Sequence, residues 1–501
     1  MFKAAFKKNS SLKDVFWNLA GGIITGVSII LITPLYIKLL GVDGYGILSL
    51  WLVFQVMLGL FDFGMGPTIV KEFSREIQDK QYRLDLLKTA ETFNLIISLL
   101  IFSLFFFSSN WLGTNWFKST FFTPNDLSLT IKLISISIAL QFPSSIYLNV
   151  LTGLQEHKKM NIILITSNLI RHILGIGVLI IKPSLNYFFT IQIIFALIQT
   201  VSLKFYIWDL LKEKKLTIPK VNLKILKPIW RFSVGMAITS FAAVALSNID
   251  KVILSKMVTT RELGNYSIAF SATGILQLAI QPFYKTYFPR YSQLITENNV
   301  LKTTYEYFRS CQLMATILIS ISVVGFVFAP YLFKIWIGQF DHSIILIFRI
   351  LLFSITCSGL MWLPSAFQQA NNWTRLHFNM ILFALISGIP LVIFSTAKFG
   401  VIGGTVIWVI HGISELTFGL WLMHQRILIG QLGSWYKKVI LMPLLIALPI
   451  TLLSNFFASY LQNIWIIFIQ IGFTGIIILT TIYFLYLRNT QEELVVNTTK
   501  I

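Results

Sequence analysis

The sequence predicts an all-α polytopic membrane protein with about 14 transmembrane helices, arranged as two pseudo-symmetric six-helix bundles plus two C-terminal helices. Three observations lead to this fold class: a composition too apolar for a soluble protein, the length and number of the apolar runs, and a similarity between runs six helices apart. Of the 501 residues, 55% are hydrophobic and only 12% are charged, with a mean hydropathy of +0.75. Soluble domains carry about twice that share of charge, so the excess apolar surface must face lipid.

The apolar runs are long enough to cross a bilayer, because a helix needs about 20 mostly apolar residues for that. The first run follows the N-terminus directly. It is too long for a signal peptide and lacks a clear cleavage site, so we expect it to be retained. We expect transmembrane helices over residues 15–40, 45–70, 87–109, 129–153, 160–181, 186–208, 227–250, 264–287, 307–332, 343–368, 376–397, 400–423, 437–457 and 461–487.

The lysine and arginine residues indicate the orientation of these helices. An even number of helices places both termini on one side of the membrane. With the N-terminus in the cytoplasm, 29 of the 40 lysine and arginine residues fall in cytoplasmic segments, 9 in outer segments and 2 within spans. Because positive charge concentrates in cytoplasmic loops, we expect both termini to be cytoplasmic.

The domain organisation follows from the longest cytoplasmic connection, "DLLKEKKLTIPKVNLKILKP" (209–228), which is basic and contains Pro219. It separates the sixth span from the seventh, so we interpret it as a linker between two lobes. The predicted domains are then an N-terminal six-helix lobe over 1–208, a C-terminal six-helix lobe over 229–424, and two additional helices with a cytoplasmic tail over 425–501.

Two pairs of segments suggest that the lobes are repeats. "LGVDGYGILSL" (40–50) and "RELGNYSIAFS" (261–271) both place Gly, Tyr and then Ile at a helix entrance, in the second and eighth spans. "LTGLQEHKKMN" (151–161) and "AFQQANNWTRLHFN" (366–379) both join a Gln-containing helix end to the next apolar helix through a short polar turn. The alternative is a chance similarity between amphipathic turns.

Several classes of protein are disfavoured. The formal net charge of +20 is spread over the loops between apolar runs, so we do not expect nucleic acid as a partner. Cys311 and Cys357 both sit in apolar runs and are interpreted as small hydrophobic residues rather than a disulfide. The chain shows no P-loop, no zinc-ligand spacing and no nucleophile–base motif, so we expect no enzymatic activity, no cofactor and no metal.

The opening of the chain resembles the Wzx-type flippases of polysaccharide and O-antigen biosynthesis: "SLKDVFWNLAGGIITGVSIILITPLYIKLLGVDGYGILSLWLVFQVMLGLFDFGMGPTIVKEFSRE". The elements that carry the resemblance are Asn18 and Gly22, Pro34, the turn "LGVDGYG" and the segment "LFDFGMG". "LGNYSIAFSATGILQLAIQPFYKTYFPRYSQL" and "GLQEHKKMN" are also similar to this family. Its superfamily, called MOP, also contains the MATE multidrug exporters and the lipid II flippases.

The resemblance implies a V-shaped pair of six-helix bundles that rock around a central cavity in the bacterial plasma membrane. The implied cargo is an isoprenoid-pyrophosphate-linked oligosaccharide, moved from the inner to the outer leaflet, with membrane lipids and glycan polymerase or ligase machinery as further partners. Lipid II flippases carry arginines in the first, second and eighth helices, whereas "GGIITGVSIILITPLYIKLL" and residues 264–287 contain none. This departure favours the oligosaccharide branch.

Two other functions stay open beside the flippase. A MATE-like exporter of organic cations would share the architecture but would need acidic residues in its cavity. A membrane enzyme such as a polysaccharide polymerase or ligase would need a large outer loop, and the longest outer segment here, 110–128, has only 19 residues.

Ionisable residues at membrane depth are the candidate functional residues, because each costs from about 3 to over 10 kcal/mol unless it faces water or a partner. Arg171 has about ten apolar-rich residues on either side, so its side chain cannot reach an interface roughly 15 Å away. A guanidinium binds phosphate through a planar fork of donors, which suits a pyrophosphate head group. The alternative is a buried ion pair with Asp62 or Glu415. The predicted substrate-binding residues are Arg171, His172, Asp62, Arg231 and Arg349.

The remaining ionisable residues have less specific interpretations. His411 and Glu415 are four residues apart, hence on one helix face, and are predicted to couple transport to an ion, or else to steady the helix as a local polar contact. Asp62 marks either a break in the second span or its plain end. Arg349, like Arg231, is close enough to an interface to snorkel, which favours packing. Asp250 is expected to be a solvated helix end.

Overall fold

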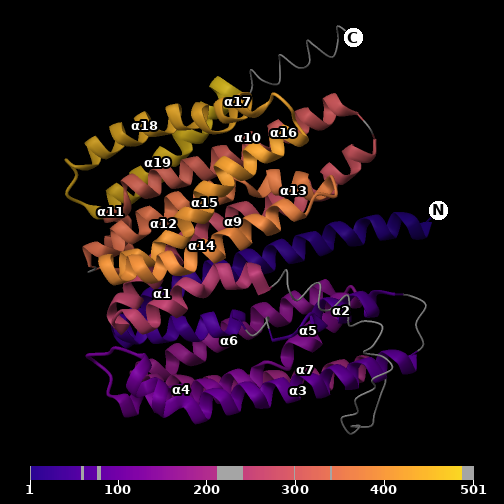
Figure 1. The fold of residues 1–501 in the computed structure, drawn as a ribbon, viewed down its shortest axis with the longest axis vertical. Coiled ribbons are helices and arrows are strands. Elements are labelled where there is room, and N and C mark those ends of the chain that lie inside the picture. Colours follow the sequence, from indigo (N-terminus) through magenta and orange to yellow (C-terminus); the bar gives the residue numbers. More distant parts are fainter. Residues whose placement is uncertain are drawn as a thin grey trace. The chain divides into compact units, whose positions relative to one another are not determined.

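The computed structural model describes residues 2–57, 61–75, 80–211, 241–297, 299–338 and 341–487. This part of the chain is helical almost throughout, and its β pairing is confined to one isolated bridge between Lys118 and Thr259. Eleven of its helices are long and apolar enough to cross a membrane (Figure 1). The predicted class, an all-α polytopic membrane protein, is confirmed.

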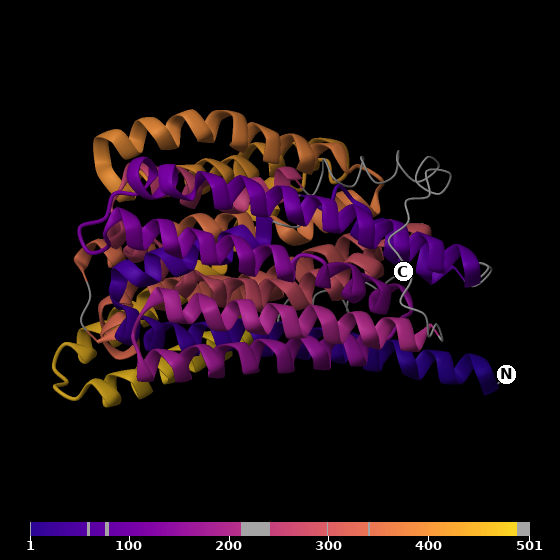
Figure 2. The same cartoon turned by 90° about the horizontal axis from the view of Figure 1, so that it is seen from below.

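The chain forms two compact units, Met1–Ser267 and Ile268–Ile501. Within each unit, taken by itself, the long helices run roughly parallel or antiparallel to one another (Figure 2). In the first unit, α4 packs against both α3 and α7, and α6 packs against α1. Its helices are α1 (Phe2–Met57), α2 (Met65–Ser74), α3 (Lys80–Trp111), α4 (Pro124–Gln141), α5 (Ser144–Gly153), α6 (His157–Ile181), α7 (Leu185–Leu210), a helix over residues 241–257, and the start of α9 (Thr260–Thr296).

In the second unit, α10 packs against α12 and α18, and α14 packs against α15. The last two long helices, α18 and α19, lie side by side (Figure 1). The helices that follow α9 are α10 (Val300–Val327), α11 (Ala329–Ile337), α12 (His342–Leu360), α13 (Trp362–Ala370), α14 (Arg375–Phe399), α15 (Val406–Ser414), α16 (Leu420–Arg426), α17 (Leu432–Trp435), α18 (Met442–Ala458) and α19 (Ile464–Ile482).

The first predicted span and the start of the second lie in one helix, α1, whose two halves fold back on each other. The second span was predicted to reach residue 70, but α1 ends at Met57 and a turn over 61–64 precedes α2. The helical backbone is interrupted at Gly41, whose φ of 72° falls in the region that favours glycine. The Thr33 hydroxyl lies 3.4 Å from the Tyr45 hydroxyl. Twelve residues of straight helix would separate these positions by roughly 18 Å, so the chain must reverse at Gly41.

The eleventh and twelfth predicted spans are likewise joined in one helical stretch, Arg375–Arg426. It is broken at Gly400, which has a φ of 61°. A Cβ on Gly388 would lie 2.6 Å from the Ile407 side chain, although a straight helix would put these residues roughly 28 Å apart. These two joined pairs, and a seventh span described only from residue 241, account for the difference between 14 predicted and 11 observed spans.

The turns in the two similar segments 151–161 and 366–379 have the same backbone structure. Gln155, with a φ of 60°, follows α5, and Asn372, with a φ of 57°, follows α13. In both turns the left-handed residue donates its N–H three residues back, and the next residue donates five residues back. This is the Schellman motif that ends many helices. Each turn also follows a short helix split from a longer one, which supports a genuine internal repeat.

The other pair of similar segments, 40–50 and the start of 261–271, lies in direct contact within the first unit. α1 and the start of α9 cross at glycines: a Cβ on Gly46 would lie 2.3 Å from the Thr260 carbonyl oxygen. One turn further along, the hydroxyls of Ser49 and Ser267 are 2.7 Å apart. Both helices present a Gly-x-x-Ser pattern at this crossing, with Gly264 as the second glycine, and small residues of this kind allow membrane helices to approach closely.

Candidate functional site

Arg171 is buried inside the first unit, at mid-length of α6, with 7% of its surface exposed. Its guanidinium lies between two aromatic rings, 5.7 Å from the ring centre of Trp51 and 5.4 Å from that of Phe195. Nη1 donates to Gln55 Oε1 at 3.3 Å, and Nε is buried without a hydrogen-bond partner among the described residues. The guanidinium is therefore held by π faces and one amide.

The two carboxylates considered as ion-pair partners of Arg171 are bonded elsewhere. Asp62 follows the second half of α1 in a turn, and its Oδ2 accepts from the Gly66 N–H at 2.6 Å, at the start of α2. Glu415 lies between two histidines of the second unit. Burying an ion costs several kcal/mol, whereas cation–π contacts return about 0.5–2 kcal/mol each. Arg171 is thus a buried cation with residual affinity for an anion.

Amide side chains also lie in the interior of the first unit, some of them partly buried and some fully buried. Gln55 Nε2 donates to Gln141 Oε1 at 2.7 Å, linking α1 to α4. Asn94 and Gln192 are at most 2% exposed, and the described residues offer no partner to the amide atoms of either. A buried amide without a partner costs about 1–3 kcal/mol, which indicates water or ligand in this interior. Sequence reasoning missed these residues, although amides within apolar spans were a visible signal.

His172 ties α6 to the first half of α1. Its Nδ1 lies 2.9 Å from the Tyr36 hydroxyl, and Tyr36 is 4% exposed, with its ring edge-on to Phe188. His172 and Arg171 therefore contact opposite halves of the α1 hairpin. The described residues give neither of them a hydrogen bond or ion pair to Asp62.

His411 and Glu415 lie together in the second unit, and a third residue joins them. His411 Nε2 is 3.6 Å from Glu415 Oε2, and His377 Nδ1 is 3.3 Å from Glu415 Oε1. The carboxylate side chain is only 4% exposed, whereas that of His377 is 37% exposed. Glu415 begins a π-helical turn, Glu415–Gly419, a feature that often occurs at functional sites. His377 lies at the N-terminal end of the predicted span 376–397, and sequence spacing gave no signal that links it to Glu415.

Arg349, another predicted substrate-binding residue, joins two helices of the second unit. Arg349 Nε donates to the Phe326 carbonyl at 2.9 Å, and its guanidinium is 5.1 Å from the Phe326 ring centre. This contact fastens α12 to α10. Arg231 lies outside the described residues.

The prediction that Asp250 is a solvated helix end is wrong. Asp250 is completely buried and forms an ion pair with Lys251 at 3.5 Å, while the Tyr266 hydroxyl donates to its Oδ2 at 2.5 Å. The start of α9 supplies Tyr266 and covers the pair. Adjacent opposite charges looked like a surface feature because the sequence did not show that another helix packs over them.

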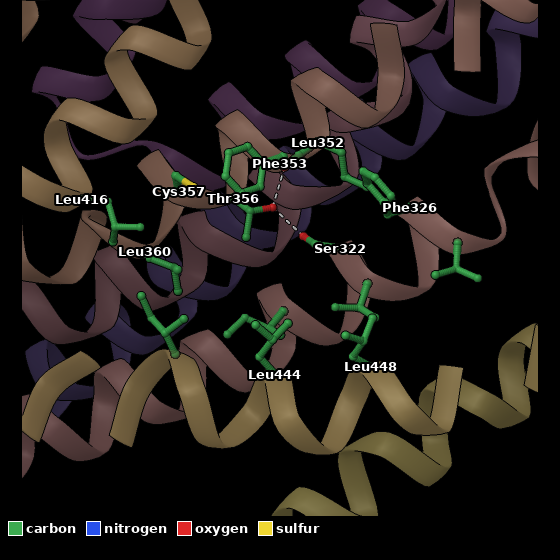
Figure 3. A pocket seen from close by; sticks show the side chains of 14 residues that line it. Ser322, Phe326, Leu352, Phe353, Thr356, Cys357, Leu360, Leu416, Leu444 and Leu448 are labelled. Atoms are coloured by element: carbon green, nitrogen blue, oxygen red, sulfur yellow. Dashed lines mark hydrogen bonds between the residues drawn. The ribbon is translucent and has the colours of Figure 1, made fainter. Parts of the chain in front are cut away.

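An apolar cavity of about 320 Å³ lies in the second unit, between α10, α12 and α18 (Figure 3). Its polar side chains satisfy each other: the hydroxyls of Ser322 and Thr356 are 2.5 Å apart, and Thr356 also donates to the Leu352 carbonyl at 2.6 Å. Leucine, isoleucine, valine and phenylalanine side chains form most of the wall. The cavity therefore suits hydrocarbon and offers nothing to a sugar.

The chain is similar to known membrane proteins in sequence. The profile of the family described as "Polysaccharide biosynthesis protein" matches residues 11–295. A relative named "Putative O-antigen transporter", from Shigella flexneri, is 23% identical over 417 residues, which cover 82% of this chain and 97% of the relative.

The fold is similar to solved structures of the MOP superfamily. The lipid II flippase MurJ in an inward closed conformation aligns with a TM-score of 0.69 at 17% identity, over 96% of this chain and 99% of that chain. An inward-facing multidrug resistance MATE family transporter aligns with a TM-score of 0.61 at 14% identity, over 85% of this chain and 96% of that chain. At these identities the likeness concerns the fold.

Proposed function

This chain belongs to the polysaccharide biosynthesis protein family, and from that premise we propose that it is a flippase for an isoprenoid-pyrophosphate-linked oligosaccharide. It moves this lipid from the inner to the outer leaflet of the bacterial plasma membrane by alternating access, for the synthesis of surface polysaccharide. The similarity to an O-antigen transporter over nearly the whole of that relative supports this proposal.

The observation that carries the proposal is the cation buried in the first unit. Arg171 has no ion-pair partner among the described residues and retains an unused donor at Nε. Because it is shielded from salt, its charge acts on an approaching anion more strongly than a surface charge would. Its burial between Trp51 and Phe195 means that direct contact with pyrophosphate requires these rings to separate.

The membrane potential favours the proposed direction. The cell interior is negative, and moving one elementary charge across 100 mV is worth about 2.3 kcal/mol. An anionic pyrophosphate head group that moves outward runs with this field. Export of organic cations, the alternative function, would run against it and would also face the repulsion of Arg171.

We propose supporting roles for the other ionisable residues predicted from the sequence. His172, Asp62, Arg231 and Arg349 assist in substrate binding. His411 and Glu415 couple transport to an ion. Both termini lie in the cytoplasm, the lobes are divided at the basic linker, and glycan polymerase or ligase machinery receives the product.

Substitution of Arg171 tests the proposal. In cells that depend on this chain for surface glycan, Arg171→Ala should abolish glycan export while membrane insertion is retained. Arg171→Lys should restore export only in part, because it keeps the charge but loses the planar fork. The readout is surface glycan on intact cells, together with the amount of protein in the membrane.

Lys159→Ala is the matched control, because it removes one positive charge from the exposed start of the same helix. Lys159 pairs with Glu156 at 3.1 Å, a surface ion pair worth about 0–1 kcal/mol. Its export should equal that of the wild type. Full export by Arg171→Ala would remove the residue from the proposed mechanism.

A further inference from the structure

A buried carboxylate between two histidines connects a partly exposed position to the interior of the second unit. The chain of contacts runs from His377 on α14, through Glu415, to His411 on α15, with distances of 3.3 and 3.6 Å. The His377 side chain is 37% exposed, whereas those of Glu415 and His411 are only 4% and 11% exposed. His411 Nδ1 is buried and makes no hydrogen bond to the described residues.

The chemistry of the three groups suits a mobile proton. A carboxylate accepts a proton, and each imidazole can accept at one nitrogen while donating at the other. With both histidines neutral, an ionised Glu415 would be an uncompensated buried anion, which is costly. One added proton neutralises the site wherever along the chain it resides. The site therefore has two states that differ by one proton and by one buried charge.

Other ionisable groups on the elements packed against Glu415 are engaged elsewhere. From α16, His424 Nδ1 contacts the Leu420 carbonyl, and Arg426 lies over the Trp373 ring at 4.6 Å. From α12, Cys357 packs against the backbone at Gly412.

Within the described part of the chain, the other ionisable residues of two further neighbouring elements do not bind Glu415 either. The Tyr436 hydroxyl donates to the Leu416 carbonyl at 2.6 Å. Arg375 and Lys398 stand near the two ends of α14, and among the described residues neither forms an ion pair with Glu415. His377 and His411 are thus the groups that balance its charge.

The backbone hydrogen-bond pattern of the helix changes at Glu415. The helix turns from α-helical to π-helical at Glu415, so the carboxylate sits at a change of helical register between α15 and α16. π-Helical turns of this kind commonly occur at functional sites. A change in the charge of Glu415 therefore acts on a segment that connects two halves of a membrane-spanning helix.

We propose that His377, Glu415 and His411 form the proton-carrying site of this transporter, with His377 exchanging protons with water at the end of α14. This inference rests on the proposed flippase function and deepens it, by adding His377 and by making the coupling ion a proton. Protons that bind at this site move inward in exchange for the exported head group.

The first experiment measures proton binding without transport. The purified full chain in lipid vesicles is titrated with acid while the infrared band of protonated carboxylic acid is recorded. The wild type should show a component that is absent in Glu415→Gln and shifted to another pH in His377→Gln. Because the proton can reside on the carboxylate or on an imidazole, the imidazolium bands are recorded as well, and absence of any component that Glu415→Gln removes or shifts overturns the proposal. His377→Gln keeps the test decisive if Glu415→Gln folds poorly, because His377 is partly exposed.

The second experiment measures coupling in cells that depend on the chain for surface glycan. A difference of one pH unit across the membrane is worth about 1.36 kcal/mol per proton. If one proton is exchanged per cycle, the equilibrium ratio of outer-leaflet to inner-leaflet lipid-linked glycan therefore changes tenfold per pH unit. Acidifying the medium by one unit should therefore raise export by up to about tenfold in the wild type. In Glu415→Gln the change should be less than about twofold.

Glu297→Gln is the control for this experiment. Glu297 is a carboxylate at the exposed end of α9, where a hydrogen bond from Lys302 lowers its pKa. Its variant should keep the wild-type response to pH. Equal responses of the wild type and Glu415→Gln overturn the proton site but leave the flippase proposal standing. Absence of glycan export by the wild type overturns the flippase proposal, whereas the infrared titration stands independently.

Discussion

The crossing of α1 and α9 predicts that Gly264→Ala destabilises the protein although alanine favours helices. A Cβ on Gly264 would lie 2.2 Å from the Val42 carbonyl oxygen, a backbone atom that cannot rotate away. Gly274, in the same helix, has no atom within 4 Å of its own Cβ position. Gly274→Ala is therefore a matched control that has the same gain in helix propensity and no clash.

The expected loss of unfolding free energy in Gly264→Ala follows from these distances. Non-bonded atoms are at their best separation at about 3.5–4.0 Å, so the two helices must move apart by more than about 1 Å. Overpacking of this kind costs typically about 1–3 kcal/mol. The same displacement breaks the 2.7 Å contact between Ser49 and Ser267, which loses about 0.5–1.5 kcal/mol more. Gly264→Ala should thus be about 3 kcal/mol less stable than Gly274→Ala.

The assay is equilibrium unfolding in mixed micelles with increasing SDS, read by tryptophan fluorescence. Gly274→Ala should unfold at the wild-type midpoint or above it, because alanine is favoured over glycine in a helix by about 1 kcal/mol. Gly264→Ala should unfold at a clearly lower SDS fraction. Identical midpoints for the two variants would show that the helices are not packed at this crossing as described.

Two further substitutions test single contacts. Asp250→Ala removes the carboxylate that pairs with the buried Lys251 and should cost about 3–5 kcal/mol of unfolding free energy in the same assay. The double variant with Lys251→Met should recover part of the loss, and no recovery would mean that the ion pair is not the cause. Thr123→Ala removes the capping box in which Thr123 and Asp126 bond each other's backbone at the start of α4, and should cost about 1 kcal/mol; an unchanged midpoint would show that this helix end does not contribute to stability.

The fold could be predicted to a large extent from the sequence because lipid leaves a membrane-spanning chain few choices. Without water to bond its backbone, each long apolar run must become a helix. The turn at Gly41 lies in the gap predicted between the first two spans, whereas Gly400 was predicted as the first residue of the twelfth span and the break lies there. What the runs did not reveal is that some spans are split, such as α4 from α5 and α12 from α13.

The candidate site could be predicted only one residue at a time. Arg171 stood out because a guanidinium at mid-membrane is costly. Its environment did not stand out, because its neighbours Trp51 and Phe195 come from other helices and read as ordinary apolar positions. The link from Glu415 to His411 was available from their spacing of four residues, since that spacing puts two side chains on one helix face.

The sequence by itself determined the class of this protein: a bundle of membrane-spanning helices that contain Arg171 and a few other titratable groups. Tertiary structure alone decided what those groups touch. It surrounded Arg171 with aromatic rings and an amide, brought His377 to Glu415 from another helix, and buried Asp250 under α9. The physical reason is that helix periodicity fixes neighbours three and four residues apart, whereas contacts between helices depend on which faces pack, and apolar faces of similar composition do not encode that choice locally.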